Sequence, residues 1–392
     1  MRKRSILIIG LISLAIIVWL TSYSIEKYAI GGAEETIRQA ELLLVKKKPA
    51  QAIDDLKWLL KYDPENDKAL FYLAQSYFLQ EDYTSASIQF ARLSKDSKYY
   101  EPAVLNAAMC YFLDEKIELA EEAFKSYLAE YPNSSTARTE LQWIYFNQFR
   151  VRDAENLLKE RLPYVEDPFP LLVHLLYIEF KPPIAQESIR LLKKINDAEP
   201  GQASILLALG YCYWKLGEID EARALIEEVQ LVNPHRIDSI LVAADFYLEL
   251  GELQKCEAIL QPKQKYPQKI QKMLEKDDRW FWVRSRFQFQ KDNLKMALEE
   301  IQAALKVDPY QMKYLQHTGM ILQAMGQQQE AQQFFQKAKS LARTYRELYK
   351  IVSSGALSHP TNAICLQVSW YCEELGKMKE SREWKKVAAS FK

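Results

Sequence analysis

The sequence predicts an all-α protein, built as a stack of helix pairs and preceded by one membrane-spanning helix. Three observations lead to this prediction. Small residues recur every 34 positions, a period typical of a repeated two-helix unit. Gly and Pro number only 11 and 15 among 392 residues, too few for a turn-rich β protein. An apolar run near the N-terminus is long enough for a membrane span.

The N-terminal segment is predicted to anchor the chain in a membrane. Residues 6–23 are almost entirely apolar and extend for roughly 27 Å as a helix, against about 30 Å for the hydrocarbon core. Trp19 and Tyr23 mark its far end, as aromatic side chains do at a membrane interface. A signal peptide cleaved after the weak candidate site at residues 29–31 is the alternative, and it would release the protein.

The charges beside this segment predict its orientation. Arg2, Lys3 and Arg4 precede it, and Lys27 is the only basic residue soon after it. The positive-inside rule therefore keeps the N-terminus in the cytoplasm and places the rest of the chain on the trans side of the membrane. In a bacterium this compartment is the periplasm.

The residues that recur every 34 positions are predicted to mark the close approach of two helices in each unit. They are Ala52, Ala86, Ala120, Ala154, Ser188, Ala222 and Cys256. A large apolar residue follows four positions later each time, at Leu56, Phe90, Phe124, Leu158, Leu192, Ile226 and Leu260. Prolines at 64, 132, 200 and 234 fall in the same register, where they would end the second helix of a unit.

The stretch 203–236 shows the pattern most completely, with Leu206, Gly210, Tyr213, Gly217 and Ala222 all in register. It resembles the tetratricopeptide repeat, a helix–turn–helix unit of 34 residues. The resemblance extends from residue 33 to about 388, with units beginning at 33, 67, 101, 135, 169, 203, 237, 278, 312 and 362. It implies an α-solenoid, a right-handed superhelix of about ten such units.

The predicted organisation follows from these positions. It comprises a cytoplasmic basic tail (1–4), a transmembrane anchor (5–23), a linker (24–32), seven contiguous units (33–270), an insertion (271–277), two further units (278–345) and a helical C-terminal tail with a degenerate capping pair (346–392). The irregular stretches around residues 264–278 and 344–361 are predicted to loosen the superhelix or lengthen a helix.

The resemblance implies that the first helix of each unit lines a concave face. The positions that face this side carry apolar or aromatic residues in much of the chain: Phe71, Phe78, Leu105, Met109, Phe112, Trp143, Phe146, Tyr177, Phe180, Tyr211 and Trp214. Any one of these rings alone is better explained by packing between units, but packing does not require all of them. We expect them to form an aromatic groove for an apolar or amphipathic-helical segment of a partner protein.

Several kinds of chemistry are not predicted. The Lys and Asn residues of the carboxylate clamp found in some tetratricopeptide co-chaperones are missing from the corresponding positions. The four His and five Cys lack metal-ligand spacing, and no nucleotide-binding or hydrolase motif is present. The net charge of zero gives no excess of basic residues that would favour binding to nucleic acid. We therefore expect no catalysis, no cofactor, no metal and no nucleic-acid partner.

The function expected from the sequence is that of a membrane-anchored scaffold for protein–protein interaction. A periplasmic chaperone or assembly factor that handles many unfolded chains is the first alternative. A receptor resembling those of mitochondrial import, with its repeats in the cytosol, is a further one. The sequence leaves the partner and the state of self-association open.

Overall fold

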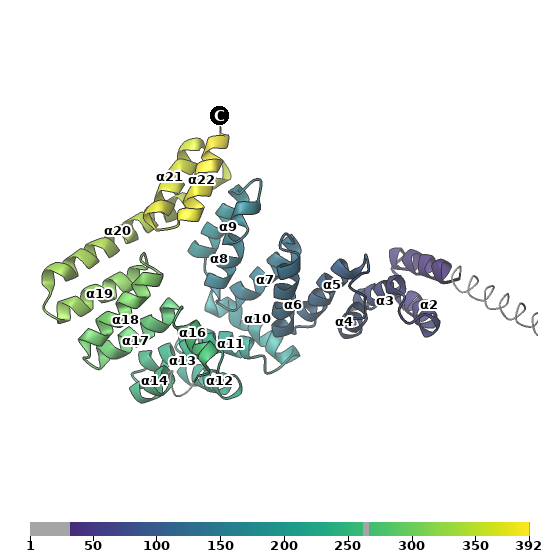
Figure 1. Ribbon diagram of the computed structural model, residues 1–392, viewed down its shortest axis with the longest axis horizontal. Coiled ribbons are helices and arrows are strands. Elements are labelled where there is room, and N and C mark those ends of the chain that lie inside the picture. The colour runs from purple at the N-terminus through teal and green to yellow at the C-terminus, as the bar shows by residue number, and fades with distance from the viewer. Residues whose placement is uncertain (1–31, 262–265, 392) are drawn as a thin grey trace, which may run out of the picture. The chain divides into compact units, whose positions relative to one another are not determined.

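The structure is a computed structural model that describes residues 32–261 and 266–391. Within these residues all regular secondary structure is helical, so the predicted all-α class is confirmed. The chain divides into two compact units, Met1–Ala137 and Arg138–Lys392. In each unit, neighbouring helices pack side by side as an α-solenoid (Figure 1).

The first unit consists of consecutive helix pairs. After an initial helix at residues 32–45, its helices are α2 (Pro49–Tyr62), α3 (Asp67–Leu79), α4 (Tyr83–Phe90), α5 (Tyr100–Leu113) and α6 (Ile117–Glu130). The following helix, α7 (Ser135–Asn147), begins in the first unit and continues into the second. Side-chain caps fix two of the helix starts: Asn66 accepts a hydrogen bond from the amide of Ala69, and Asp82 from that of Ser85.

The second unit continues the same pattern of pairs. Its helices after α7 are α8 (Val151–Lys159), η1 (Leu162–Tyr164), α9 (Phe169–Phe180), α10 (Ala185–Ala198), α11 (Ala203–Leu216), α12 (Ile219–Val232), α13 (Ile237–Glu249), α14 (Leu253–Leu260), α16 (Gln268–Leu274), α17 (Asp278–Gln290), α18 (Leu294–Val307), α19 (Met312–Ala324), α20 (Gln328–Ser353), η2 (Ala356–Ser358), α21 (Asn362–Glu374) and α22 (Met378–Ser390).

The small residues of the 34-residue pattern lie at the predicted close approaches. Ala52, Ala86, Ala120, Ala154, Ala222 and Cys256 are completely buried. At Gly210, a Cβ atom would lie 3.1 Å from Cγ1 of Ile226, the large apolar residue of the same unit. The space between the two helices of a pair is therefore filled, and a larger side chain at these positions would overpack it.

Both irregular stretches contain helices in the part of the chain that the structure describes. The insertion overlaps the short helix α16, which precedes α17. The predicted boundary at residue 345 falls inside α20, a single helix of 26 residues. The second helix of this pair is thus lengthened rather than interrupted, and the degenerate C-terminal pair is α21 with α22.

The C-terminal pair packs back against the beginning of the second unit. Trp384 of α22 is completely buried, and its ring meets that of Phe169 edge-on at a centroid distance of 5.8 Å. Lys377 forms an ion pair with Glu179, and Lys159 lies 3.3 Å from Glu380. The end of this unit therefore contacts α8 and α9, which are far away in the sequence (Figure 1).

No helix among the described residues is both long enough and apolar enough to cross a membrane. The predicted anchor at residues 5–23 and most of the predicted linker lie outside these residues.

A concave cavity of the second unit as the candidate functional site

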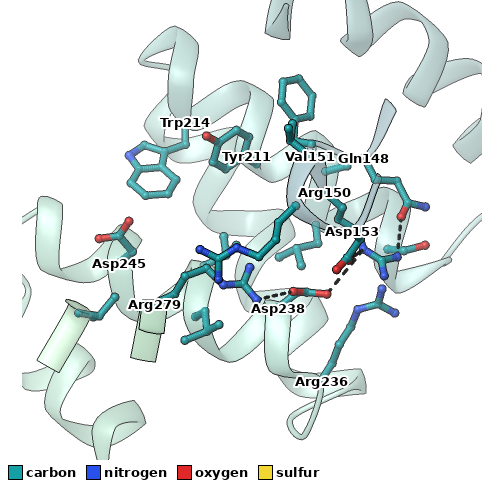
Figure 2. A pocket seen from close by; sticks show the side chains of 18 of the residues that line it. Gln148, Arg150, Val151, Asp153, Tyr211, Trp214, Arg236, Asp238, Asp245 and Arg279 are labelled. Atoms are coloured by element: carbon teal, nitrogen blue, oxygen red, sulfur yellow. Dashed lines mark hydrogen bonds and ion pairs between the residues drawn. The ribbon is translucent and has the colours of Figure 1, made fainter. Parts of the chain in front are cut away.

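A cavity of about 300 Å³ lies on the concave side of the second unit. One wall consists of the helices α11, α13, α17 and α19, which are the first helices of four successive pairs. The opposite wall is the turn at residues 148–150, which joins α7 to α8, together with the first residues of α8 up to Asp153 (Figure 2). Its volume lies at the lower end of the range of small-ligand sites, about 300–1,000 Å³.

The wall residues occupy equivalent positions in successive repeats. Ser204, Asp238, Arg279 and Lys313 are each the second residue of their helix. Leu207, Leu241 and Trp282 occupy the fifth position, and Tyr211 and Asp245 the ninth. The predicted groove residue Tyr211 belongs to this set, so the cavity lies on the side that the repeat resemblance assigns to the concave face.

Aromatic and aliphatic side chains form the apolar part of the wall. The rings of Tyr211 and Trp214 meet edge-on with centroids 5.9 Å apart, and Trp214 also contacts Phe246 at 5.5 Å. Leu207 and Leu241 are buried beside them. Since Trp214 is 6 % exposed, it supports the wall from behind, whereas the half-buried Tyr211 presents part of its ring to the cavity.

The turn opposite this wall carries a residue in an unusual conformation. Phe149 has a φ of 60°, in the left-handed region, where several other helix pairs have Gly. A bulky side chain is disfavoured there by about 1–2 kcal/mol. The Phe149 ring packs against Tyr211 at a centroid distance of 5.2 Å.

Arginine and aspartate side chains alternate along the boundary between the turn and the wall. Arg150 contacts Asp153 at 2.8 Å and Asp238 at 3.9 Å, measured from its Nε to the carboxylate oxygens. Arg279 reaches the other oxygen of Asp238 at 3.5 Å and pairs with Asp277 at 2.7 Å. Figure 2 shows Asp238 between the two guanidinium groups. These contacts attach the turn to α13 and α17.

Asp278 is the most deeply buried charge of this network. Arg152 donates to its carboxylate through both terminal nitrogens, one of them at 2.9 Å, and the Tyr314 hydroxyl donates to it at 2.7 Å. Burial alone would raise the pKa of the Asp278 carboxyl, but these hydrogen bonds outweigh it, so the pKa is lowered below 3.8. Asp278 is therefore ionised at neutral pH.

Lys313 differs from the other cations of the cavity. Among the described residues no carboxylate lies within ion-pair distance of its ammonium group; that group instead lies 5.2 Å from the centroid of the Trp282 ring. Desolvation within the concavity lowers the pKa of Lys313 below 10.5, although the side chain as a whole remains in contact with solvent. The site therefore combines an apolar wall with the ammonium group of Lys313, which has no carboxylate partner in the part of the chain that the structure describes.

Part of the predicted groove lies in the first unit, at Phe71, Phe78, Leu105, Met109 and Phe112. Phe71 is buried and stacks on Tyr99 at 5.0 Å, so it belongs to the core and not to an exposed wall. The others are half-buried, and Phe112 packs against Phe124 at 6.4 Å. The first unit thus uses several of these rings to join its helices.

The remaining predicted groove residues lie in the second unit, at Trp143, Phe146, Tyr177, Phe180, Tyr211 and Trp214. Of these, only Tyr211 and Trp214 line the cavity. Phe180 packs against Tyr345 of α20 at 4.6 Å and so contacts the chain itself. Tyr177 is 40 % exposed outside the cavity. The structure therefore assembles only part of the predicted aromatic stripe into one site.

The sequence-based prediction missed the charged residues of the site. Asp238, Arg279 and Lys313 occupy the second position of their helices, and a comparison of that position along the repeats would have found them. Arg150 and Arg152 had no such signal, because the α7–α8 turn and the start of α8 reach the wall only through the fold. No group of His, Cys, Asp and Glu that could hold a metal ion occurs within the ranges 32–261 and 266–391.

Comparison with known proteins identifies the repeats. Tetratricopeptide-repeat profiles match residues 37–100, 103–134, 185–239 and 313–345. The chain therefore contains tetratricopeptide repeats in both units, as its sequence pattern predicted. No curated protein sequence matches it.

Several solved structures are similar to part of the chain. A crystal structure of MamA is 18% identical and covers 40% of this chain and 87% of its own, with a TM-score of 0.33. MamA from residue 41 to its end, from Desulfovibrio magneticus RS-1, is 18% identical and covers 50% of this chain and 96% of its own, with a TM-score of 0.34. A structure of MamA AMB-1 is 19% identical and covers 41% and 83%, with a TM-score of 0.32. These values are too low to indicate what this chain binds.

Proposed function

We propose that this protein is a membrane-anchored scaffold that binds a segment of a partner protein in the concave cavity of its second unit. Its tetratricopeptide repeats support a role in protein–protein interaction. The observation that carries the proposal is the cavity itself, because residues from four successive repeats converge on it with both apolar and charged side chains. The protein would act by binding and not by catalysis.

The proposed anchor is the apolar segment 5–23, with the repeats on the trans side of the membrane. The charge bias of residues 2–4 supports this orientation. Anchoring would raise the effective concentration of the binding site near other membrane proteins. The partner's segment would have an apolar side chain against Tyr211 and Trp282, since these rings form the accessible apolar surface of the cavity.

Site-specific photo-crosslinking in membranes tests the binding site. A photoreactive phenylalanine analogue replaces Tyr211 in the cavity, and in the matched control it replaces Leu231, which is 83 % exposed on α12. We expect a discrete adduct with one partner at Tyr211 that does not form at Leu231. Adducts at Leu231 alone, or none at either position, would show that the cavity is not the binding site.

Labelling of an introduced cysteine tests the topology. The native cysteines of the described residues are buried, and burial raises the pKa of the Cys110, Cys212 and Cys372 thiols to about 12, so their background reaction is slow. Ser353→Cys adds an exposed thiol at the end of α20. A membrane-impermeant maleimide should label it in intact cells. Labelling only after lysis would place the repeats in the cytoplasm.

A further inference from the structure

Four arginines in or beside the cavity have a carboxylate within ion-pair distance. Arg150 pairs with Asp153, Arg152 with Asp278, Arg279 with Asp277, and Arg286 with Asp245. Each guanidinium group in this set therefore has its own carboxylate. Lys313 has no such partner among the residues that the structure describes, although it lines the same cavity.

The place of Lys313 in its helix makes the lack of a partner costly. It lies in the first turn of α19, where the backbone carries partial positive charge and a cation is disfavoured. Arg279 occupies the equivalent position in α17, but there Asp277 caps the helix and pairs with it. The first turn of α19 contains no acidic residue. An anion from outside would relieve the repulsion at Lys313.

Charges of both signs surround Lys313, but no carboxylate among the described residues forms an ion pair with it. Asp245 and Asp278 favour its charged form, whereas Arg152 and Arg286 oppose it. Desolvation is the largest effect, and it lowers the pKa of Lys313 despite the two aspartates. A bound carboxylate would supply the missing charge. A doubly charged phosphate suits the site less well, because Asp153, Asp238 and Asp245 also line the cavity.

We propose that the cavity recognises an acidic side chain within the partner's segment, with Lys313 as its counter-ion and a neighbouring large apolar side chain of that segment on the Tyr211–Trp282 wall. This inference rests on the proposed binding role of the cavity and names the chemistry that it selects. The volume of about 300 Å³ suits a few side chains and not a folded surface. The partner would therefore present an extended segment or the edge of a helix.

Binding of labelled peptides to the full chain in detergent tests the proposal. The first probe is the fluorescein-labelled amide Gly-Ser-Ala-Glu-Phe-Ala-Ser-Gly, and the second replaces its Glu with Gln. The third is the Gln peptide with a free C-terminal carboxylate. The protein variants are Lys313→Gln and the matched control Lys295→Gln, which removes an exposed Lys from α18. Fluorescence anisotropy reports the dissociation constants, and the thermal midpoint verifies that both variants fold.

We expect the unmodified protein to bind the Glu peptide about tenfold more tightly than the Gln peptide. Lys313→Gln should abolish this preference, and Lys295→Gln should retain it. Equal binding of the two peptides to the unmodified protein would overturn the acidic specificity but leave the proposed binding site intact. Tight binding of the free-acid Gln peptide alone would assign the site to a chain terminus and contradict a side-chain ligand. If no probe binds at about 1 mM, both proposals fail for segments of this kind.

Discussion

The guanidinium group of Arg152 binds the buried carboxylate of Asp278, although the two residues lie 126 positions apart. Asp278 is 1 % exposed, and the hydroxyl of Tyr314 completes its hydrogen bonding. This contact joins α8 to α17 and α19 without involving the helix pairs between them in the sequence. It holds the α7–α8 turn and the start of α8 against the concave wall and thereby gives the cavity its second side.

Arg152→Met should destabilise the protein by about 3 kcal/mol, because it leaves the Asp278 carboxylate buried without a counter-ion. The double variant Arg152→Met, Asp278→Asn should lose less unfolding free energy, since no unpaired charge remains buried. Denaturant unfolding of the second unit measures both. Arg190→Met removes an exposed arginine of α10 and serves as the control. Equal losses in the single and double variants would show that the pair contributes little.

The elements of the fold could be predicted because their signals are local. Ala222 and Ile226 are buried where the two helices of one pair meet. Because such contacts recur in every pair, the 34-residue period alone identified these positions. The same holds for Gly217, whose φ of 82° ends α11 at the predicted turn. Helix α20 was predicted less well, because its extension to Ser353 has no repeat position to mark it.

The candidate site could be predicted only in part. Tyr211 was found because it occupies a concave repeat position. Phe180 occupies such a position too, but Tyr345 covers it, a contact that depends on how α20 packs against α9. The pairing of Arg152 with Asp278 likewise depends on the curvature accumulated over the intervening repeats. No spacing rule in a single sequence reports contacts of this kind.

His317 should make the stability of the second unit depend on pH. It is 6 % exposed between the Trp282 and Phe289 rings, and burial lowers its pKa to about 4, assisted by Arg286. In the unfolded chain His317 should take up a proton near pH 6.5, whereas in the folded chain it should do so only near pH 4. The unfolding free energy should therefore fall by roughly 3 kcal/mol as the pH decreases through this window.

Replacement of this histidine isolates its contribution. His317→Leu should flatten the pH dependence between pH 6.5 and pH 4, because the group that takes up a proton on unfolding is gone. His359→Leu removes an exposed histidine and should leave the profile unchanged. Denaturant unfolding over this range measures the slope. A profile for His317→Leu that parallels the unmodified protein would refute the assignment.

Gly319→Ala should destabilise the protein, although alanine is normally the better helix former by about 1 kcal/mol. A Cβ atom at this position would lie 2.5 Å from Cε1 of Phe335, a rigid ring. We expect a net loss of about 2 kcal/mol in thermal or denaturant unfolding. The double variant Gly319→Ala, Phe335→Leu should recover part of it. Gly210→Ala should destabilise the protein less, because the nearest atom to its Cβ, Cγ1 of Ile226, would lie farther away, at 3.1 Å.

The ion pair between Glu179 and Lys377 should hold the C-terminal helix pair against α9. The two side chains are 13 % and 21 % exposed, so their charges are largely removed from water. Lys377→Glu would place a carboxylate beside both Glu179 and the nearby Glu380. We expect this substitution to lower the unfolding free energy by about 3 kcal/mol. Adding Glu179→Lys restores opposite charges and should recover most of the loss.

Hydrogen exchange distinguishes this docking from a general effect on stability. In the Lys377→Glu variant, amides of α21 and α22 should exchange faster while those of α11 and α12 keep their protection, because only the contact with α8 and α9 is broken. The double variant should return α21 and α22 to slow exchange. If α21 and α22 exchange equally fast in the unmodified protein, the C-terminal pair is not docked in solution. The contact between the Trp384 and Phe169 rings would then form only transiently.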